Sequence, residues 1–469
     1  MLNPADQGFI DTLTAEVGAS LLRPPSEHYL TEPRGKFQGI AGCIVAPRST
    51  EEVAKIVRLC AAHNVGIVPF GGGTGLVCGQ VKPDGPAPVV LSLEKLSAIR
   101  EVSNTENTLV AEAGVTLSAI HEAARNAHRL FPLALASEGS CTAGGFLSTN
   151  AGGSYTLRYG NARALCLGLE AVLPNGEIWH GLTPLRKDNM GYDLRDLLIG
   201  AEGTLGIITA ASLRLFPAPR KSAVALLAVP DPQGALDLLN MAQDTLGEVV
   251  SAYELMHRQG FDFLSEALPH LRTPFDTPPE WTILIDIGAP EALDLDTKFS
   301  QFLDHAISSS LVLDGWIAQS DKQASEFWNL RESIPVANRA IGAISSHDIS
   351  LPLSKLPEFI ERAETVVNKL GQFRINCFGH AGDGNLHYNV YPPKGGNKAD
   401  YQNQAPAIMQ AIHDLVHEMA GSISAEHGIG RLKADDLEKY GDPAKLAAMR
   451  AIKSALDPLG IMNPGAVLK

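Results

Sequence analysis

Residues 137–153 read Ser-Glu-Gly-Ser-Cys-Thr-Ala-Gly-Gly-Phe-Leu-Ser-Thr-Asn-Ala-Gly-Gly, and this stretch is rich in glycine. Two further glycine-rich stretches, Gly71–Gly75 and Gly200–Gly206, flank it in the chain. Glycine permits positive φ angles and lets backbone amides approach a ligand closely. Successive amides in such turns can hold an anion. Three such stretches in one half of the chain therefore predict a long anionic ligand touched at several points, such as a dinucleotide.

The common nucleotide-binding motifs are absent. The sequence contains no G-x-x-x-x-G-K-[ST] motif, and Gly71–Gly75 does not complete G-x-G-x-x-G because Leu76 stands where the third glycine belongs. The glycine stretches therefore support neither a P-loop nor a Rossmann dinucleotide fold.

Secondary-structure signals around the first glycine stretch alternate between strand and helix. A short apolar strand at 43–47 is followed by a helix that Ser49 opens, with Glu52 at the capping-box spacing. A second strand at 66–70 then runs into Gly71–Gly75, which completes an α/β unit. Further expected elements are strands at 89–93, 108–112 and 168–173 and a helix from Thr116 to about Leu130.

The sequence pattern changes at Pro217–Lys221, where the glycine-rich stretches end and alternating strands and helices begin, and this change predicts a domain boundary. We expect a first domain at residues 1–219 and a second at 220–420, where apolar strands such as 281–287 alternate with helical stretches. Residues 421–469 are expected to form a helical C-terminal segment that completes the active site.

Composition excludes several classes of protein. The 469 residues are 45% hydrophobic, enough for a large core and against intrinsic disorder. The net charge of −14 argues against nucleic acid as a partner. The six cysteines show no C-x-x-C spacing and are expected to be reduced core residues. With neither a signal peptide nor an apolar run long enough to span a bilayer, we expect a soluble, cytoplasmic protein.

A second group of chemically active residues lies near the C-terminal end. The segment 378–389 reads Phe-Gly-His-Ala-Gly-Asp-Gly-Asn-Leu-His-Tyr-Asn, and Glu426 and His427 follow later. Gly382 and Gly384 allow a tight turn between two strands that returns His387 to His380. Two imidazoles and a carboxylate are typical of a catalytic metal site for Zn²⁺, Mn²⁺ or Fe²⁺. The alternative is a set of hydrogen-bonded polar residues at a domain seam.

The three glycine stretches resemble, in order and spacing, the FAD-binding domain of the vanillyl-alcohol oxidase / p-cresol methylhydroxylase superfamily. The resemblance implies an α+β fold with a two-subdomain FAD-binding domain, an α/β substrate (cap) domain and a small helical C-terminal segment. It also implies bound FAD, expected to be non-covalent because no histidine lies in the loops, with the edge of the Ile207-Ile208-Thr209 strand near the isoalloxazine and adenine. The implied FAD-binding residues are Pro69, Phe70, Gly71, Gly72, Gly73, Thr74, Gly75, Leu76, Ser137, Gly139, Ser140, Cys141, Gly144, Gly145, Thr149, Asn150, Gly152, Gly153, Glu202, Gly203, Gly206, Ile207, Ile208 and Asn463.

The motif H-x-G-D-G-N-x-H followed by E-H-G-I-G extends the resemblance over nearly the whole chain. It is similar to the D-2-hydroxyacid dehydrogenases, in the branch of the D-2-hydroxyglutarate and D-lactate dehydrogenases. This resemblance implies that His380, His387 and Glu426 bind a divalent metal, with zinc favoured and manganese or iron as alternatives. It also implies that His427 is the catalytic base and binds substrate together with Asn389.

The same resemblance assigns Arg331, in the segment Trp328-Asn329-Leu330-Arg331-Glu332, to the substrate carboxylate. A guanidinium fork matches a carboxylate bidentately, so the assignment is chemically reasonable. Without the family, Arg331 is expected to form a surface ion pair.

The implied reaction is oxidation of a D-2-hydroxy acid to the 2-oxo acid. Hydride passes to flavin N5, the proton passes to His427, and the electrons go on to an electron-transfer flavoprotein or a quinone-type acceptor. Four alternatives stay open: an oxidase that uses O₂, a relative of alkyl-dihydroxyacetone-phosphate synthase, a non-catalytic flavin-binding protein and a metallohydrolase without flavin.

Two positions depart from the family in the substrate region. Ser346 stands where relatives commonly have a lysine that holds a substrate carboxylate, and Pro335 stands where some have a hydroxyl. The acid therefore stays open among D-2-hydroxyglutarate, D-lactate, D-malate and bulkier D-hydroxy acids. For assembly, a homodimer is only a working hypothesis.

Overall fold

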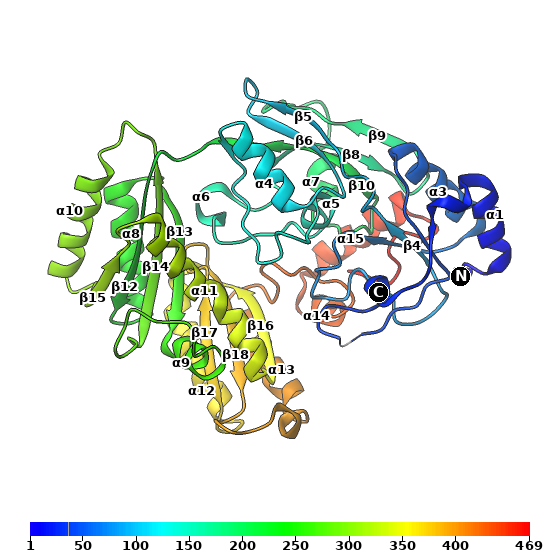
Figure 1. Ribbon diagram of the computed structural model, residues 1–469. Helices are drawn as coiled ribbons and strands as arrows, with labels where there is room; N and C mark the ends of the chain where they lie inside the picture. The colour runs from blue at the N-terminus through cyan, green and yellow to red at the C-terminus, as the bar shows by residue number, and fades with distance from the viewer. Residues whose placement is uncertain (36) are drawn as a thin grey trace. The chain divides into compact units, whose positions relative to one another are not determined.

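The computed structural model describes residues 1–35 and 37–469, which divide into two compact units. The first unit comprises Met1–Gly152, Gly160–Ala218 and Glu426–Lys469, and the second comprises Gly153–Tyr159 and Pro219–Ala425. The chain thus leaves the first unit after Ala218 and returns to it at Glu426. The C-terminal residues are part of the first unit rather than a segment of their own (Figure 1).

The first unit contains a four-stranded sheet in the order β1-β2-β4-β3. Strands β2 (Cys43–Val45), β4 (Val89–Ser92) and β3 (Ile67–Phe70) are parallel, and β1 (Leu22–Arg23) adds antiparallel to β2. Helices α1 (Gln7–Val17) and α3 (Thr50–His63) share an apolar core with this sheet. Ser49 caps α3 by accepting from the Glu52 amide, as the sequence predicts.

The second sheet of this unit is antiparallel, in the order β5-β6-β10-β8-β9. Its strands are β5 (Ile99–Ser103), β6 (Thr108–Glu112), β10 (Ile207–Arg214), β8 (Cys166–Val172) and β9 (Ile178–Gly181). Strand β10 lies between β6 and β8, but its pairing with β6 covers only Ala210–Arg214, so Ile207 and Ile208 at the start of the strand pair with β8 alone.

The helix expected from Thr116 to Leu130 ends earlier. Thr116 does cap α4 (Leu117–Asn126). His128 then adopts a left-handed φ of 55°, and β7 (Arg129–Leu130) pairs with β11 (Phe216–Pro217). Tertiary pairing with a distant segment therefore overrides the helical periodicity. The remaining elements of the unit are η1 (Ala19–Leu21), α2 (Glu27–Leu30), α5 (Ala143–Ser148), α7 (Leu194–Leu198), α14 (Ala434–Tyr440) and α15 (Pro443–Leu456).

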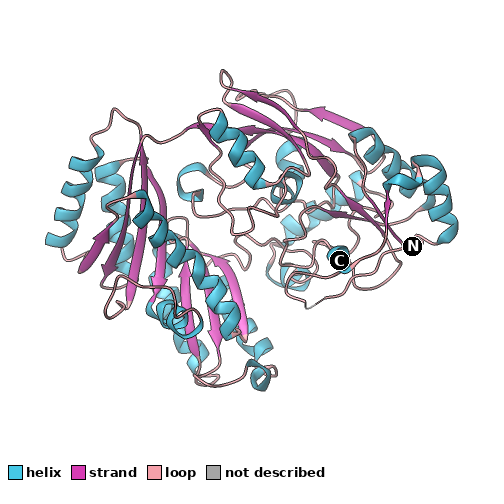
Figure 2. Ribbon diagram, viewed as in Figure 1, coloured by secondary structure: helices cyan, strands magenta, loops and turns pink. Residues whose placement is uncertain are grey.

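The second unit is built on one seven-stranded antiparallel sheet in the order β15-β12-β14-β13-β17-β18-β16. Its strands are β12 (Lys221–Val229), β13 (Val250–His257), β14 (Trp281–Ala289), β15 (Asp314–Ile317), β16 (Ser345–Ser350), β17 (Arg374–Gly379) and β18 (Asn385–Tyr391). Helices and strands of this unit are distinguished by colour in Figure 2.

Helices cover both faces of this sheet. On one face, α9 (Arg258–Ala267) and α11 (Asp321–Ile341) form a core with apolar side chains of the strands, including Met256 and Phe378. On the other face lie α8 (Pro232–Leu246), α10 (Leu295–Ser308), α12 (Leu356–Asn368) and α13 (Ala405–Glu418). Shorter elements are α6 (Thr156–Tyr159), η2 (Leu353–Lys355) and η3 (Lys398–Tyr401).

Strand register places the polar residues of the second unit on the α9/α11 face. Side chains alternate between faces along a strand, so His387 shares its face with Asn389. Asp348 on β16 and Phe378 on β17 lie opposite His387. Phe378 in turn lies opposite Met256, and Glu254 shares the face of Met256. The polar cluster thus borders the apolar core of α9 and α11.

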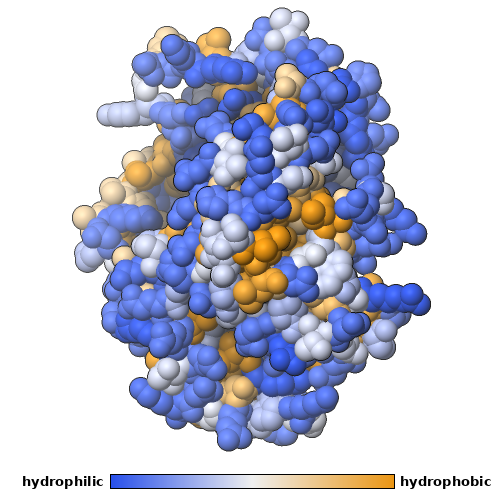
Figure 3. Space-filling view, turned by 90° about the vertical axis from the view of Figure 1, so that its left-hand side faces the viewer, coloured by the Kyte–Doolittle hydropathy of each residue, from blue (hydrophilic) through white to orange (hydrophobic). Residues whose placement is uncertain are grey.

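The surface of the second unit includes exposed apolar residues, whereas the cysteines of the chain are buried. Apolar side chains emerge between hydrophilic ones in Figure 3, and Ile307, Leu313 and Ile317 are exposed large apolar residues of the second unit. None of the helices in residues 1–35 and 37–469 combines the length and apolar character that crossing a bilayer requires. All six cysteines are buried free thiols, as predicted.

Candidate active site

The first two glycine stretches pack backbone to backbone in the first unit. A Cβ at Gly72 would lie 1.9 Å from the carbonyl oxygen of Ser140, and one at Gly71 would lie 2.7 Å from Thr142 Oγ1. Neither position has room for a side chain. At Gly139, in contrast, a Cβ would meet no heavy atom of the described residues within 4 Å. The two stretches therefore form a close-packed backbone cradle that is open at Gly139.

The third glycine stretch joins the same cradle. A Cβ at Gly203 would lie 2.4 Å from Pro69 Cγ, and Gly203 has a φ of 71°. The Glu202 amide donates to the Ser148 carbonyl at 2.8 Å. The segments around residues 69–76, 137–153 and 200–206 thus converge, and exposed backbone of this kind fits the phosphates of a dinucleotide.

Glu202 and Asn463 turn their polar side chains toward protein backbone. The Glu202 carboxylate accepts from the amides of Ile429 at 2.7 Å and Gly430 at 2.8 Å, and burial raises the pKa of this carboxyl. Asn463 Nδ2 donates to the carbonyls of Gly79 at 3.1 Å and Glu202 at 2.8 Å. Both side chains therefore tie the third glycine stretch to the C-terminal residues of the same unit.

Ile207 and Ile208 are only 1% and 4% exposed, and Ile207 belongs to the apolar core of the unit. Because their side chains are buried, their backbone is the part that could contact a cofactor.

Replacing Glu202 by alanine should destabilise the first unit. The change leaves the Ile429 and Gly430 amides without their acceptor, and the Gly430 amide is buried. An unsatisfied buried donor costs about 1–3 kcal/mol, so we expect the free energy of unfolding to fall by about 2–4 kcal/mol. Chemical denaturation followed by far-UV circular dichroism measures this. An unchanged midpoint and slope would show that the carboxylate does not hold this segment.

In the second unit, a buried carboxylate links two of the predicted site residues. Arg331 donates to Glu254 Oε2 through Nε at 2.8 Å and through Nη2 at 2.7 Å. Glu254 Oε1 lies 2.6 Å from His380 Nδ1. Arg331 is 3% exposed and Glu254 is fully buried, so the expectation of a surface ion pair at Arg331 is wrong. Its partner comes from β13, which is distant in sequence.

The charges around Glu254 keep it ionised. Burial alone would raise its pKa, but Arg331 and His380 outweigh burial and lower the pKa from 4.5 to about 2. A carboxyl with a lowered pKa stabilises the fold fully above its ordinary pKa of 4.5 and loses that contribution as the pH falls toward 2. The cluster is therefore intact at neutral pH.

His387 lies beside His380, with 5.6 Å between their ring centroids, because the turn through Gly382 and Gly384 folds β18 back on β17. Its Nδ1 is 3.7 Å from Asp348 Oδ1, and Asn385 Nδ2 donates to the same oxygen at 3.0 Å. Asp348 thus lies where it can orient His387.

Glu426 follows directly after Ala425, whose amide donates to the Asp348 carbonyl. His380, His387 and Glu426 form one group of residues that could hold a metal ion. Asp348, Glu426 and His427 form a second such group. Two imidazole nitrogens and a carboxylate oxygen suit one divalent cation of the zinc, manganese or iron class.

The residues of the substrate region occupy the same sheet face. Asn389 is 8% exposed and lies opposite the exposed Ser346 on β16. Pro335 lies inside α11, one turn after Arg331. Because proline has no amide hydrogen, it cannot donate to the Arg331 carbonyl as a helical residue would.

Sequence reasoning missed Glu254 and Asp348. A signal was present for Glu254, since it is the one acidic residue in the apolar strand Val-Ser-Ala-Tyr-Glu-Leu-Met-His at 250–257. A buried carboxylate in such a strand requires partners. Its identity as the partner of Arg331 and His380 depends on strand register, which the local sequence does not contain.

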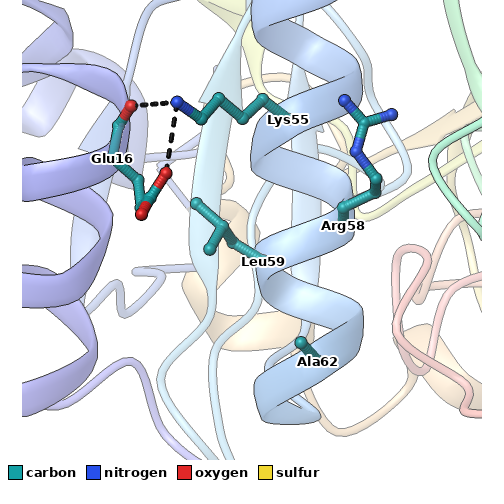
Figure 4. Close-up of a pocket in the computed structure, with 5 residues that line it drawn as sticks. All are labelled: Glu16, Lys55, Arg58, Leu59 and Ala62. Carbon is teal, nitrogen blue, oxygen red and sulfur yellow. Dashed lines mark hydrogen bonds and ion pairs between the residues drawn. The ribbon is translucent and has the colours of Figure 1, made fainter.

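A surface hollow in the first unit is lined by other residues than those of the predicted site. It lies on α1 and α3 and is lined by Glu16, Lys55, Arg58, Leu59 and Ala62 (Figure 4). Lys55 forms an exposed ion pair with Glu16 at 3.2 Å. None of the predicted site residues lines this hollow.

Comparison with known proteins first defines the class. The family model described as FAD binding domain matches residues 41–181, and that of FAD linked oxidases, C-terminal domain, matches residues 218–467. A solved p-cresol methylhydroxylase shares the fold with a TM-score of 0.76 at 17% identity, covering 100% of this chain and 98% of that one. An alkyldihydroxyacetonephosphate synthase gives 0.74 at 17%, covering 99% and 85%. The protein is a flavoprotein with the vanillyl-alcohol oxidase / p-cresol methylhydroxylase fold, as the glycine stretches predict.

Curated relatives then narrow the class. The chain is 39% identical over 437 residues to a protein of Oryza sativa subsp. indica named probable D-2-hydroxyglutarate dehydrogenase, mitochondrial, covering 92% of this chain and 76% of that one. It is 36% identical over 447 residues to a D-2-hydroxyglutarate dehydrogenase of Xanthomonas citri pv. viticola, covering 94% and 92%. The chain belongs to the FAD-dependent D-2-hydroxyacid dehydrogenases. It is therefore an oxidoreductase that acts on the CH–OH group of a D-2-hydroxy acid.

Proposed function

We propose that this enzyme oxidises a D-2-hydroxy acid with non-covalent FAD and one divalent cation, and passes the electrons to a separate acceptor. The observation that carries the proposal is the cluster of Arg331, Glu254, His380 and His387 on one sheet face of the second unit. A guanidinium for a carboxylate and imidazoles for a cation are what a 2-hydroxy acid requires.

Arg331 would bind the carboxylate of the substrate. Among the hydrogen bonds of the described residues, Nε and Nη2 of Arg331 both go to Glu254, which leaves Nη1 for the acid. The guanidinium also lies over the ring of Phe378, 5.1 Å from its centroid. Both contacts fix the plane of the fork and hence the orientation of the bound carboxylate.

His380, His387 and Glu426 would hold the cation, for which zinc is our first choice and manganese or iron the alternatives. When bound, such an ion lowers the pKa of a coordinated hydroxyl, and FAD accepts the hydride. His427 would accept the hydroxyl proton, because a neutral imidazole is a suitable base near neutral pH. Asn389 would contribute a neutral hydrogen-bonding group to the substrate.

The substrate is proposed from the relatives and from residue 346 together. The names of the relatives favour D-2-hydroxyglutarate, whereas the neutral Ser346 and Asn389 pair favours an acid without a second carboxylate, such as D-lactate. D-malate is a further alternative.

Introducing a lysine at position 346 should shift the preference toward dicarboxylic substrates. Ser346 is exposed, so Ser346→Lys adds a cation opposite Asn389 without disturbing the core. A charge-assisted hydrogen bond contributes about 1.5–3 kcal/mol, so we expect the ratio of kcat/KM for D-2-hydroxyglutarate over D-lactate to rise about 10- to 100-fold. Ser346→Met is the control for side-chain length. An equal ratio in both variants would contradict a role for charge at this position.

An anaerobic titration with paired D- and L-2-hydroxy acids tests the proposed function. Bleaching of the flavin absorbance by D-acids alone supports it and identifies the substrate. A flavin that no 2-hydroxy acid reduces would contradict it. Turnover in air separates the two acceptor classes, because a dehydrogenase needs an added dye or electron-transfer flavoprotein, whereas an oxidase produces stoichiometric peroxide.

A further inference from the structure

Glu254 is a carboxyl group buried among apolar neighbours. It is a fully buried residue of β13, and its neighbours on the same sheet face, Met256 and Phe378, belong to the apolar core under α9 and α11. Burying a carboxylate is strongly unfavourable unless it is paired and hydrogen-bonded. A carboxylate retained at such a position indicates a specific use of both of its oxygens.

The two oxygens serve different partners. Oε2 accepts both Nε and Nη2 of Arg331, at 2.8 and 2.7 Å, so the guanidinium is held in one plane. Oε1 accepts from His380 Nδ1 at 2.6 Å. Because an imidazole that donates from Nδ1 carries its lone pair at Nε2, this contact also selects the tautomer of His380. A carboxylate behind a ligating histidine is the arrangement that orients the ring and raises its basicity toward a metal.

We propose that Glu254 is a shared positioning residue that sets both the cation affinity of His380 and the carboxylate affinity of Arg331. The inference rests on the proposed function, since it concerns the same site. The new element is a coupling between two kinds of binding. The Glu254 carboxylate, remote in sequence from both partners, orients His380 toward the cation and Arg331 toward the substrate carboxylate. A change at Glu254 therefore weakens both kinds of binding at once.

A purely structural role for Glu254 makes a different prediction. If its carboxylate only neutralised Arg331 within the core, its loss would lower the stability of the fold but leave the cation affinity of folded molecules unchanged. The distinguishing measurements are therefore binding constants of the folded protein, taken separately for the cation and for the acid.

The test uses the FAD-loaded full chain and the variant Glu254→Gln. The introduced glutamine keeps the size of the side chain but can accept with only one oxygen, while its NH₂ group opposes a second donor. We expect the dissociation constant for Zn²⁺, measured in metal buffers with metal content by plasma mass spectrometry, to rise about 10- to 100-fold. We expect the dissociation constant of the 2-oxo acid product, measured from the flavin spectrum at saturating Zn²⁺, to rise by at least about 10-fold, the effect of losing one oriented hydrogen-bonding partner.

The matched control is Glu266→Gln. Glu266 pairs with Arg374 at 2.8 Å in the same unit and contacts none of the predicted site residues through that pair. Both dissociation constants should keep their wild-type values in this variant. Unchanged constants in folded Glu254→Gln, with melting temperature lowered, would overturn the inference in favour of the structural role.

A second variant keeps the test decisive if Glu254→Gln does not fold. Glu254→Asp preserves the charge but is one methylene shorter, so it cannot reach Arg331 and His380 together. We expect it to bind FAD and to lose at least about 10-fold in Zn²⁺ affinity, and wild-type affinity for both Zn²⁺ and the acid would overturn the inference. If wild-type protein itself binds neither Zn²⁺ nor a 2-hydroxy or 2-oxo acid, the proposed function fails as a whole, which is a distinguishable result.

Discussion

In the variant His427→Asn, we expect the rate of flavin reduction by a saturating D-2-hydroxy acid to fall about 10²- to 10⁴-fold. This is the contribution of a positioned general base, and asparagine keeps the polarity and approximate size of the side chain but cannot take up a proton. FAD content should be unchanged, because the glycine cradle does not include residue 427. Anaerobic stopped-flow absorbance at the flavin band measures the rate directly.

The pH profile adds a readout that loss of packing would not alter. In the wild type, the reduction rate should depend on pH through the ionisation of the base, and in His427→Asn this dependence should disappear. His305→Asn, on the exposed side of α10, is the control and should behave as wild type. Flavin reduction at the wild-type rate in His427→Asn would show that another group accepts the proton. Metal content measured on the same sample separates loss of the base from loss of the cation, since His427 directly follows Glu426 in the chain and could itself be a metal ligand.

The substitution Gly72→Ala should abolish FAD binding. A Cβ at this position would lie 1.9 Å from the carbonyl oxygen of Ser140, which is backbone and cannot swing aside as a side chain would. The Ser140 amide is itself fixed by donation to the Ser137 carbonyl at 2.8 Å, so the two glycine stretches must move apart. Overpacking of this kind costs about 1–3 kcal/mol or more, and we expect a loss of FAD affinity of about 100-fold or more. It would be seen as colourless protein after purification.

The control for this second prediction is Gly8→Ala. Gly8 lies in α1 of the same unit, and its added Cβ would come no closer than 3.5 Å, an ordinary contact with Asp6 Oδ1. Alanine also favours helix over glycine. This variant should retain FAD at wild-type levels. A yellow Gly72→Ala protein with one FAD per chain would contradict the close packing of the first two glycine stretches.

The glycine stretches could be interpreted from sequence because their signal is local. The conformational freedom of a glycine belongs to that residue alone. The order of the three glycine stretches along the chain is therefore enough to indicate the fold class. The same holds for Ser49, whose cap of α3 involves residues three apart. In the second unit, the turn between His380 and His387 is encoded in the two glycines that separate them.

The misassigned residues depend on distant partners. Arg331 looked like a surface residue because Glu254, which buries it, lies 77 positions earlier in the chain. The helix begun at Thr116 ends early because β7 pairs with β11, near residue 216. The place of β10 between β6 and β8 is likewise an arrangement that periodicity within residues 207–214 cannot reveal. The homodimer and the cytoplasmic location stay predictions.

We propose that D-2-hydroxy acid oxidation by this enzyme requires a divalent cation held by His380, His387 and Glu426. The most direct test removes the cation from the FAD-loaded enzyme with a chelator, verifies its loss by plasma mass spectrometry and repeats the anaerobic titration. We predict a yellow protein that the D-acid no longer bleaches, with bleaching restored by one equivalent of Zn²⁺, Mn²⁺ or Fe²⁺. Bleaching at the full rate in verified metal-free enzyme would contradict the account.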